Sequence, residues 1–247
     1  MSKIVDRTLD FLELFAKEQR PLTLTDIARL LDIPLSSCHD VLRTLQARGY
    51  LYEVGQRAGF YPTLRLRDIA DDVAANDPIL IRAEEQLRQL RDELGESVSL
   101  AKATGGRMTY LLVLGSAAPL RFQLVVGTEV RSYYATSAGK AFLASLPPDE
   151  LSAYFDKTRL LPLTSHTKTD ADELTNEIRA SEEKGWFVNV EESVEGVVTV
   201  SARFSWNGAV YVATASGPIS RMRERIETVG AQISEVCHKL GAGMSGV

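Results

Sequence analysis

The sequence predicts an α+β protein with a winged helix-turn-helix at residues 1–67, a linker helix at 68–78 and a larger domain at 79–247. Three features predict this organisation. Two short helical patterns separated by a proline are followed by a hairpin pattern. An amphipathic helical segment then separates this head from the rest of the chain. Beyond it, strand-like runs fall in two groups of three, with helices between and after them. That order is typical of one antiparallel sheet with flanking helices.

The head begins with an amphipathic helix over Ile4–Lys17, and two shorter helices joined by a tight turn follow. Thr23, with Asp26 three residues later, fits the N-cap and the acid of a capping box. Pro34 ends the first short helix, because proline lacks an N–H and disfavours helical geometry in the residue before it. Ser36 is a suitable N-cap for the second short helix.

The second short helix has two chemically different faces. Its inner face is apolar and consists of Cys38, Val41, Leu42 and Leu45. Its outer face carries Ser36, Ser37, Asp40, Arg43 and Thr44, with His39 on the flank. Hydroxyl and guanidinium groups can read base edges in the DNA major groove, so this helix is a candidate for groove contacts. An ordinary helical hairpin with a solvated outer face is the alternative.

A short hairpin is predicted directly after this helix. Its strands would be Leu51–Val54 and Phe60–Tyr61, with two glycines in the turn between them. A hairpin in this position is a wing. Arg57 would lie at its tip, where it could contact phosphates.

The larger domain is predicted to contain six strands and five helices. The predicted strands are Ser97–Ala103, Met108–Leu114, Leu120–Val126, Trp186–Glu191, Val197–Ser205 and Ala209–Ser216. The predicted helices are Pro78–Leu94, Ser137–Ser145, Pro148–Asp156, Asp170–Lys184 and Arg221–Leu240. Asn207-Gly208 is a strong signal for a tight hairpin turn between the last two strands.

Composition narrows the class of protein. Hydrophobic residues make up 45% and charged residues 25% of the chain, as in soluble globular proteins. No apolar run approaches the roughly 20 residues of a membrane helix, and the N-terminus has no apolar signal core. We therefore expect a cytoplasmic protein without membrane contact. The two cysteines and three histidines are scattered, so neither a metal site nor a cofactor is expected.

Charge is distributed unevenly along the chain. Residues 1–67 hold 10 basic and 8 acidic side chains, a net charge of +2. The remaining residues hold 18 of the 28 basic and 25 of the 33 acidic side chains, a net charge of -7. A mildly basic head on an acidic body is consistent with a small DNA-reading module attached to a second function.

Several segments resemble one known family in the right order. I-V-D-R-T-L-D-F-L-E-L-F at 4–15, the two short helices and G-Y-L at 49–51 are similar to the winged helix of the IclR family of transcriptional regulators. In the larger domain the similar segments are S-A-G-K-A-F-L-A at 137–144, T-S-H-T-K-T-D at 164–170, G-W-F-V-N-V-E-E-S-V-E-G-V-V at 185–198 and A-S-G-P at 215–218. The resemblance implies that the larger domain is GAF-like and senses a small metabolite, and that the protein represses a catabolic operon.

For the head, the expected partner is double-stranded DNA with an inverted-repeat operator, bound by a homodimer or tetramer. The residues expected to contact DNA are Thr25, Ser36, Ser37, His39, Arg43 and Arg57.

For the larger domain, the expected partner is a small organic acid. The resemblance places its site at Ser137, Ala138, Gly139, Asn189, Thr199, Thr214 and Ser216. Thr214 and Ser216 are two apart on one strand, so their hydroxyls share a face. Free N–H groups near Gly139 would hold the carboxylate. Asn189 stands where an acid is common in the family, which would remove a charge that repels anions.

An enzyme of the Ser/Lys hydrolase type is the alternative. Ser137 and Lys140 match the S-x-x-K signature, and at this spacing on a helix the two side chains can face each other. The supporting S-D-N and K-T-G elements are absent. We therefore expect no enzymatic activity and assign no catalytic residue.

Overall fold

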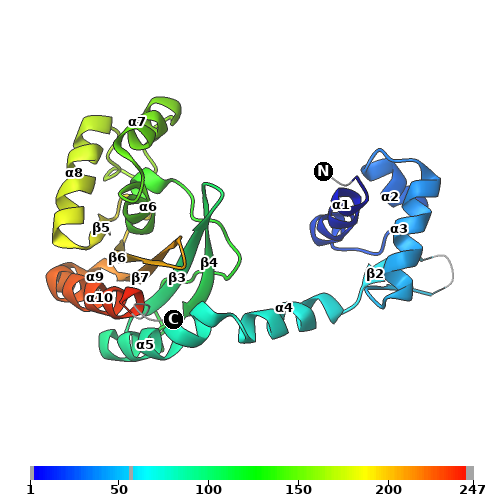
Figure 1. The fold of residues 1–247 in the computed structure, drawn as a ribbon, viewed down its shortest axis with the longest axis horizontal. Helices are drawn as coiled ribbons and strands as arrows, with labels where there is room; N and C mark the ends of the chain where they lie inside the picture. The colour runs from blue at the N-terminus through cyan, green and yellow to red at the C-terminus, as the bar shows by residue number, and fades with distance from the viewer. Residues whose placement is uncertain (1–2, 56–57, 243–247) are drawn as a thin grey trace. The chain divides into compact units, whose positions relative to one another are not determined.

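The computed structural model describes residues 3–55 and 58–242 and divides into two compact units, Met1–Asp77 and Pro78–Val247 (Figure 1). The division follows Asp77, where the sequence Asn-Asp-Pro interrupts two helical segments. None of the described helices is both long enough and apolar enough to cross a membrane.

The N-terminal unit is a helix-turn-helix followed by a hairpin and a further helix. Its elements are α1 (Lys3–Glu18), α2 (Leu24–Leu30), α3 (Leu35–Ala47), β1 (Leu51–Glu53), β2 (Phe60–Pro62) and α4 (Arg65–Ala75). Strands β1 and β2 are antiparallel, with Tyr52 opposite Tyr61. The core of this unit consists of Phe11, Leu14, Phe15, Leu22, Ile27, Ala28, Cys38, Leu42, Leu45 and Leu51.

One of the two predicted caps in this unit is confirmed and the other is wrong. The Thr23 side chain accepts a hydrogen bond from the Asp26 N–H, and Asp26 accepts one from the Thr23 N–H, which completes the capping box. Helix α3 begins at Leu35, however, with Pro34 rather than Ser36 as its N-cap and without a side-chain cap. Proline's fixed φ leads directly into a helix, so α3 starts one residue before the predicted serine cap.

The C-terminal unit is built on one antiparallel sheet with the strand order β4-β3-β7-β6-β5. The strands are β3 (Ser97–Thr104), β4 (Arg107–Leu114), β5 (Phe187–Val190), β6 (Val197–Trp206) and β7 (Ala209–Pro218). Asn207 and Gly208 both have positive φ and form the predicted turn between β6 and β7.

The predicted strand Leu120–Val126 is wrong, because this segment is irregular. The chain reaches β4 at the turn around Gly127, whose N–H donates to the Tyr110 carbonyl. Glu129 then bridges to Thr109, and the Val130 N–H donates to the Met108 carbonyl. The Phe122 carbonyl instead accepts a hydrogen bond from the Ser97 hydroxyl.

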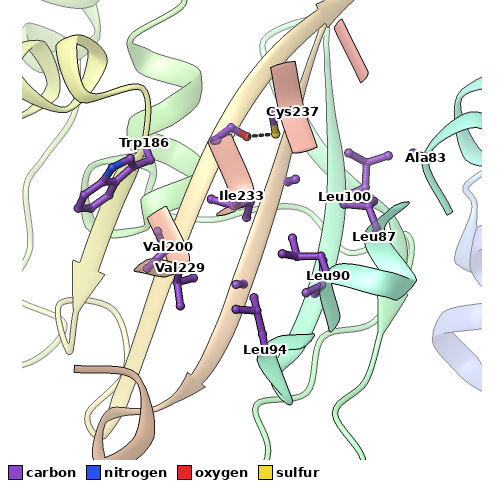
Figure 2. Close-up of a cluster of buried hydrophobic side chains, with 14 of the residues drawn as sticks. Ala83, Leu87, Leu90, Leu94, Leu100, Trp186, Val200, Val229, Ile233 and Cys237 are labelled. Carbon is purple, nitrogen blue, oxygen red and sulfur yellow. Dashed lines mark hydrogen bonds between the residues drawn. The ribbon is translucent and has the colours of Figure 1, made fainter. Parts of the chain in front are cut away.

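Helices cover both faces of the sheet (Figure 1). Two helices, α5 (Pro78–Leu94) and α10 (Ile226–Gly241), pack against one face. Helix α10 is preceded by α9 (Ile219–Met222) and the short helix η2 (Arg223–Arg225). Leu90 and Leu94 from α5 meet Val229 and Ile233 from α10 in this apolar layer, and Cys237 donates a hydrogen bond to the Ala202 carbonyl (Figure 2). The opposite face is covered by η1 (Tyr133–Ala135), α6 (Ser137–Leu143), α7 (Pro148–Lys157) and α8 (Ala171–Lys184).

Helix α6 lies unusually close to the chain that precedes it. Its N-cap is Thr136, whose hydroxyl accepts a hydrogen bond from the Gly139 N–H at 3.1 Å, so Ser137 is its first helical residue. A Cβ atom at Gly139 would lie 2.2 Å from the Tyr133 Cα and 2.4 Å from its carbonyl oxygen. Both are backbone atoms that cannot rotate away, so only glycine fits at this position.

We predict that Gly139→Ala destabilises the protein. In an open helix this change would stabilise by up to about 1 kcal/mol, but here overpacking should cost about 1–3 kcal/mol and outweigh it. Thermal unfolding shows whether the substitution lowers or raises the stability of the protein. Gly115→Ala is the matched control, because no atom lies within 4 Å of a Cβ there. Equal unfolding temperatures for the two variants would contradict the prediction.

Candidate functional site

A cavity of about 280 Å³ opens on the face of the sheet that carries α6. Strand β6 contributes Thr199, strand β7 contributes Thr214 and Ser216, and the start of α6 contributes Ser137 and Ala138. The structure therefore brings together five of the seven expected effector-site residues. A cavity of this size is suited to a small molecule.

The rest of the lining is mixed in character. The apolar part consists of Tyr110, Phe122, Leu124, Val130, Leu163 and Val194. Further hydroxyls come from Thr128, Ser132, Thr136 and Ser193. Two charged residues, Glu129 and Arg131, also line the cavity, and neither has an oppositely charged group within 4.0 Å in the part of the chain that the structure describes. Neither residue was predicted from the sequence, because both lie in an irregular segment without a motif.

Buried hydroxyls form a connected chain beneath the cavity. The Ser137 Oγ lies 2.6 Å from the Thr199 Oγ1 and 2.7 Å from the Ser201 Oγ, and Ser201 lies 2.8 Å from the Thr214 Oγ1. They meet because Ser201 is opposite Thr214 in the register of β6 and β7, and because residues two apart on a strand share a face. Ser201 belongs to this row of hydrogen-bonded hydroxyls but was not among the expected residues.

Two of the expected effector-site residues do not line the cavity. Gly139 itself offers no free N–H to a carboxylate, because that group donates a hydrogen bond to the Thr136 hydroxyl. Asn189 is buried, and its amide donates to the Ser193 Oγ at 2.7 Å and accepts from the Glu192 N–H at 2.8 Å. Asn189 therefore shapes the turn after β5 rather than the charge of the cavity.

Lys140 is not placed to activate Ser137. Its Nζ is fully buried and lies 2.6 Å from a Glu192 carboxylate oxygen and 2.8 Å from one of Glu177. The Lys140 amine is engaged by two carboxylates, and Ser137 is bonded to other hydroxyls instead of to the lysine. The geometry therefore gives no support to the S-x-x-K interpretation.

Burial and charge act in opposite directions on these two carboxylates. Burial raises the pKa of Glu192 above its usual range, and the neighbouring Lys140 offsets this only in part. Burial would also raise the pKa of Glu177, but the ammonium groups of Lys140 and Lys168 outweigh it and hold that pKa below its usual value.

In the N-terminal unit, α3 presents most of the expected DNA-contacting groups to solvent. Ser36, His39 and Arg43 are exposed on α3, and Thr25 is exposed on α2. Ser37 is half-buried and lines a groove with Arg7 and Thr8 of α1. Arg57 lies outside the described residues.

The outer face of α3 also carries the exposed acid Asp40, whose Oδ1 lies 3.9 Å from the His39 Nδ1. In the part of the chain that is described, Arg43 has no carboxylate within 4.0 Å. Its guanidinium is therefore available to an external partner.

Both units match known families. The family model described as "IclR helix-turn-helix domain" matches residues 4–55, and the one described as "Bacterial transcriptional regulator IclR C-terminal" matches residues 72–241. The chain is 30% identical to the HTH-type transcriptional regulator BhcR of Paracoccus denitrificans over 98% of its own length and 88% of that protein. It is 28% identical to the HTH-type transcriptional repressor AllR of Escherichia coli, covering 90% of this chain and 83% of that one.

The fold is also that of solved relatives. An IclR homologue from Microbacterium hydrocarbonoxydans, complexed with 4-hydroxybenzoate, superposes with a TM-score of 0.78 at 19% identity, covering 97% of this chain and 98% of that one. The family match spans more than half of the chain, and its helix-turn-helix part coincides with α1 to β1. The protein is therefore a member of the IclR family of transcriptional regulators.

Proposed function

We propose that this regulator binds an inverted-repeat operator as a homodimer or tetramer in the cytoplasm and represses catabolic genes. When a small organic acid enters the cavity, the regulator dissociates from the operator or changes its arrangement on the DNA. The observation that carries the effector proposal is the lining of that cavity. It combines apolar walls, buried hydroxyls and one charged group of each sign, the carboxylate of Glu129 and the guanidinium of Arg131.

The cavity chemistry favours a compact acid with an apolar body. Phe122, Leu124 and Tyr110 offer a dry surface for a ring or a short chain. Thr214 and Ser216 are almost fully buried and can donate hydroxyl hydrogen bonds to a polar group. Neutral hydrogen-bond donors alone do not offset the free-energy cost of moving a carboxylate out of water. Arg131 is the cationic group of the lining and can form a charge-assisted hydrogen bond with it. The 4-hydroxybenzoate bound by the Microbacterium relative makes that acid a rational first test compound.

Oligomeric binding is supported by the size and surface of the head. A module of one helix-turn-helix has a small footprint, so paired half-sites are needed for useful specificity. Exposed apolar residues on α1, among them Ile4 and Leu9, offer a surface for a second copy. Within the head, Thr25, Ser36, Ser37, His39 and Arg43 are proposed to contact the groove, and Arg57 the phosphates.

We predict that Arg43→Ala weakens operator binding by about 1–3 kcal/mol, because a bidentate contact to a base edge is lost. Arg57→Ala should instead weaken all DNA sequences alike, as a phosphate contact does. Fluorescence anisotropy with duplexes from the protein's own upstream region measures both effects. Arg88→Ala is the control, since that exposed side chain lies on α5 of the C-terminal unit and pairs with Glu84. Unchanged affinity of Arg43→Ala would show that α3 does not read bases.

We predict that a monocarboxylate stabilises the protein through Thr214 and Ser216. A panel from acetate to 4-hydroxybenzoate is screened by thermal shift. A ligand at a hundredfold excess over its Kd should stabilise the wild type by about 2.7 kcal/mol. Thr214→Val/Ser216→Ala should lose most of this gain, whereas Ser205→Ala, at an exposed hydroxyl of β6, should keep it. Equal stabilisation of all three proteins would place the ligand elsewhere.

We predict that Arg131→Gln lowers the affinity for the acid about tenfold, because a charge-assisted hydrogen bond is lost at a partly solvated site. Calorimetric titration with 4-hydroxybenzoate and with its neutral amide, 4-hydroxybenzamide, separates charge from shape. The variant should discriminate less between the two compounds than the wild type does. If both compounds lose affinity equally, Arg131 does not recognise the charge.

A further inference from the structure

One wall of the cavity is a turn between β5 and β6, residues 191–196, here called the wall turn. It contributes Ser193 and Val194 to the cavity lining. Glu191 has a φ of 62° and Gly196 a φ of 76°, both in the left-handed region. A non-glycine residue in that region persists only where its surroundings hold it.

Hydrogen bonds fix the backbone of the wall turn from several directions. The Thr167 hydroxyl donates to the Glu192 carbonyl at 2.6 Å, and the Thr164 hydroxyl donates to the Glu191 carbonyl at 2.6 Å. The Gly196 N–H donates to the Glu191 side chain at 2.9 Å. These contacts join the wall turn to the loop between α7 and α8 and to itself, but none of them reaches α6, which forms another part of the cavity lining.

Among the described residues, Lys140 provides the hydrogen bond and ion pair that link the wall turn to α6. Its ammonium lies 2.6 Å from Glu192 of the wall turn, and it is three residues after Ser137, which lines the cavity. The Lys140 side chain is 0% exposed and that of Glu192 only 6%. Among the described residues, Lys140 is the cation within 4.0 Å of Glu192, and the second carboxylate oxygen of Glu192 has no hydrogen-bond partner. The Glu192 charge thus depends on this contact, because a buried carboxylate without a cation is strongly disfavoured.

Glu177 completes the charge balance. It lies 2.8 Å from both Lys140 and Lys168, so the cluster holds two ammonium groups and two carboxylates. If Lys140 and Glu192 both lost their charge, Lys168 and Glu177 would remain a neutral pair. The contact can therefore be removed without leaving an unpaired charge.

We propose that Lys140 is a positioning residue for the effector cavity: its ion pair with Glu192 holds the wall turn against the start of α6 and so sets the distance between Ser193 and Ser137 across the cavity. This proposal rests on the proposed function of the cavity. It assigns to the buried lysine of the S-x-x-K match a role in binding geometry instead of catalysis. An effector that touches both α6 and the wall turn would require this contact for full affinity.

The test uses the full-length chain with Lys140→Met/Glu192→Gln. Both replacements keep nearly the original side-chain shape and remove one charge of each sign. Arg203→Met/Glu182→Gln is the matched control, because it removes a bidentate ion pair between α8 and β6 in the same unit, away from the wall turn. Glu192→Gln alone is the conservative variant, since its carbamoyl oxygen can still accept a hydrogen bond from Lys140.

Two quantities are measured below the unfolding temperature of every variant. Amide hydrogen exchange follows the Glu192 N–H, which is bonded to Asn189, and the Gly196 N–H, which is bonded to Glu191. Calorimetric titration with 4-hydroxybenzoate follows effector affinity. In Lys140→Met/Glu192→Gln we expect about tenfold faster exchange at these two amides and about tenfold weaker binding, because the wall turn opens locally. The control should keep wild-type values for both, and Glu192→Gln should lie between.

Unchanged exchange at the two amides would overturn the proposal. Faster exchange with unchanged affinity would also overturn it, because Lys140 would then only stabilise the turn. Failure of 4-hydroxybenzoate and the other acids of the panel to bind the wild type would count against the proposed effector class. In that case the exchange measurement still decides whether Lys140 holds the wall turn.

Discussion

Strands β3, β6 and β7 turn alternate side chains to opposite faces of the sheet, and this alternation gives the two faces of the C-terminal unit different chemistry. Val98 and Leu100 of β3 pack into the apolar layer with α5 and α10. Ser97 and Ser99 lie opposite two cavity-lining residues of β7 and face the other way. The same register sets Ser201 opposite Thr214. One sheet therefore supplies a dry core on one side and hydroxyls for a cavity on the other.

Polar side chains that are buried between the sheet and α6 need hydrogen-bond or ion-pair partners, and this need explains the arrangement around α6. Ser137 bonds to the hydroxyls of Thr199 and Ser201, and Lys140 bonds to two carboxylates. Helix α6 can approach this closely because Gly139 has no Cβ to meet the Tyr133 backbone. Close packing by a glycine and satisfaction of buried polar groups thus build one side of the cavity together.

Three of the local sequence signals were confirmed because their physical cause is local, whereas the Ser36 cap was not. The capping box at Thr23, the turn at Asn207-Gly208 and the apolar face of α3 depend on residues within a few positions of one another. Leu120–Val126 shows the limit of such signals. Its composition suits a strand, but a strand needs a partner edge, and β4 is instead paired by the chain around Glu129.

Periodicity and capping in the sequence predicted the two-unit organisation and the helix-turn-helix. The resemblance of several segments to the IclR family indicated the family and five of the residues that line the cavity. Only the tertiary structure decided that Asn189 shapes a turn, that Arg131 lines the cavity and that Lys140 pairs with Glu192. Lys140 and Glu192 are 52 residues apart in the chain. Their contact exists because helix α6 and the turn after β5 are folded against each other, and a charge finds its partner by distance in space rather than by spacing in sequence.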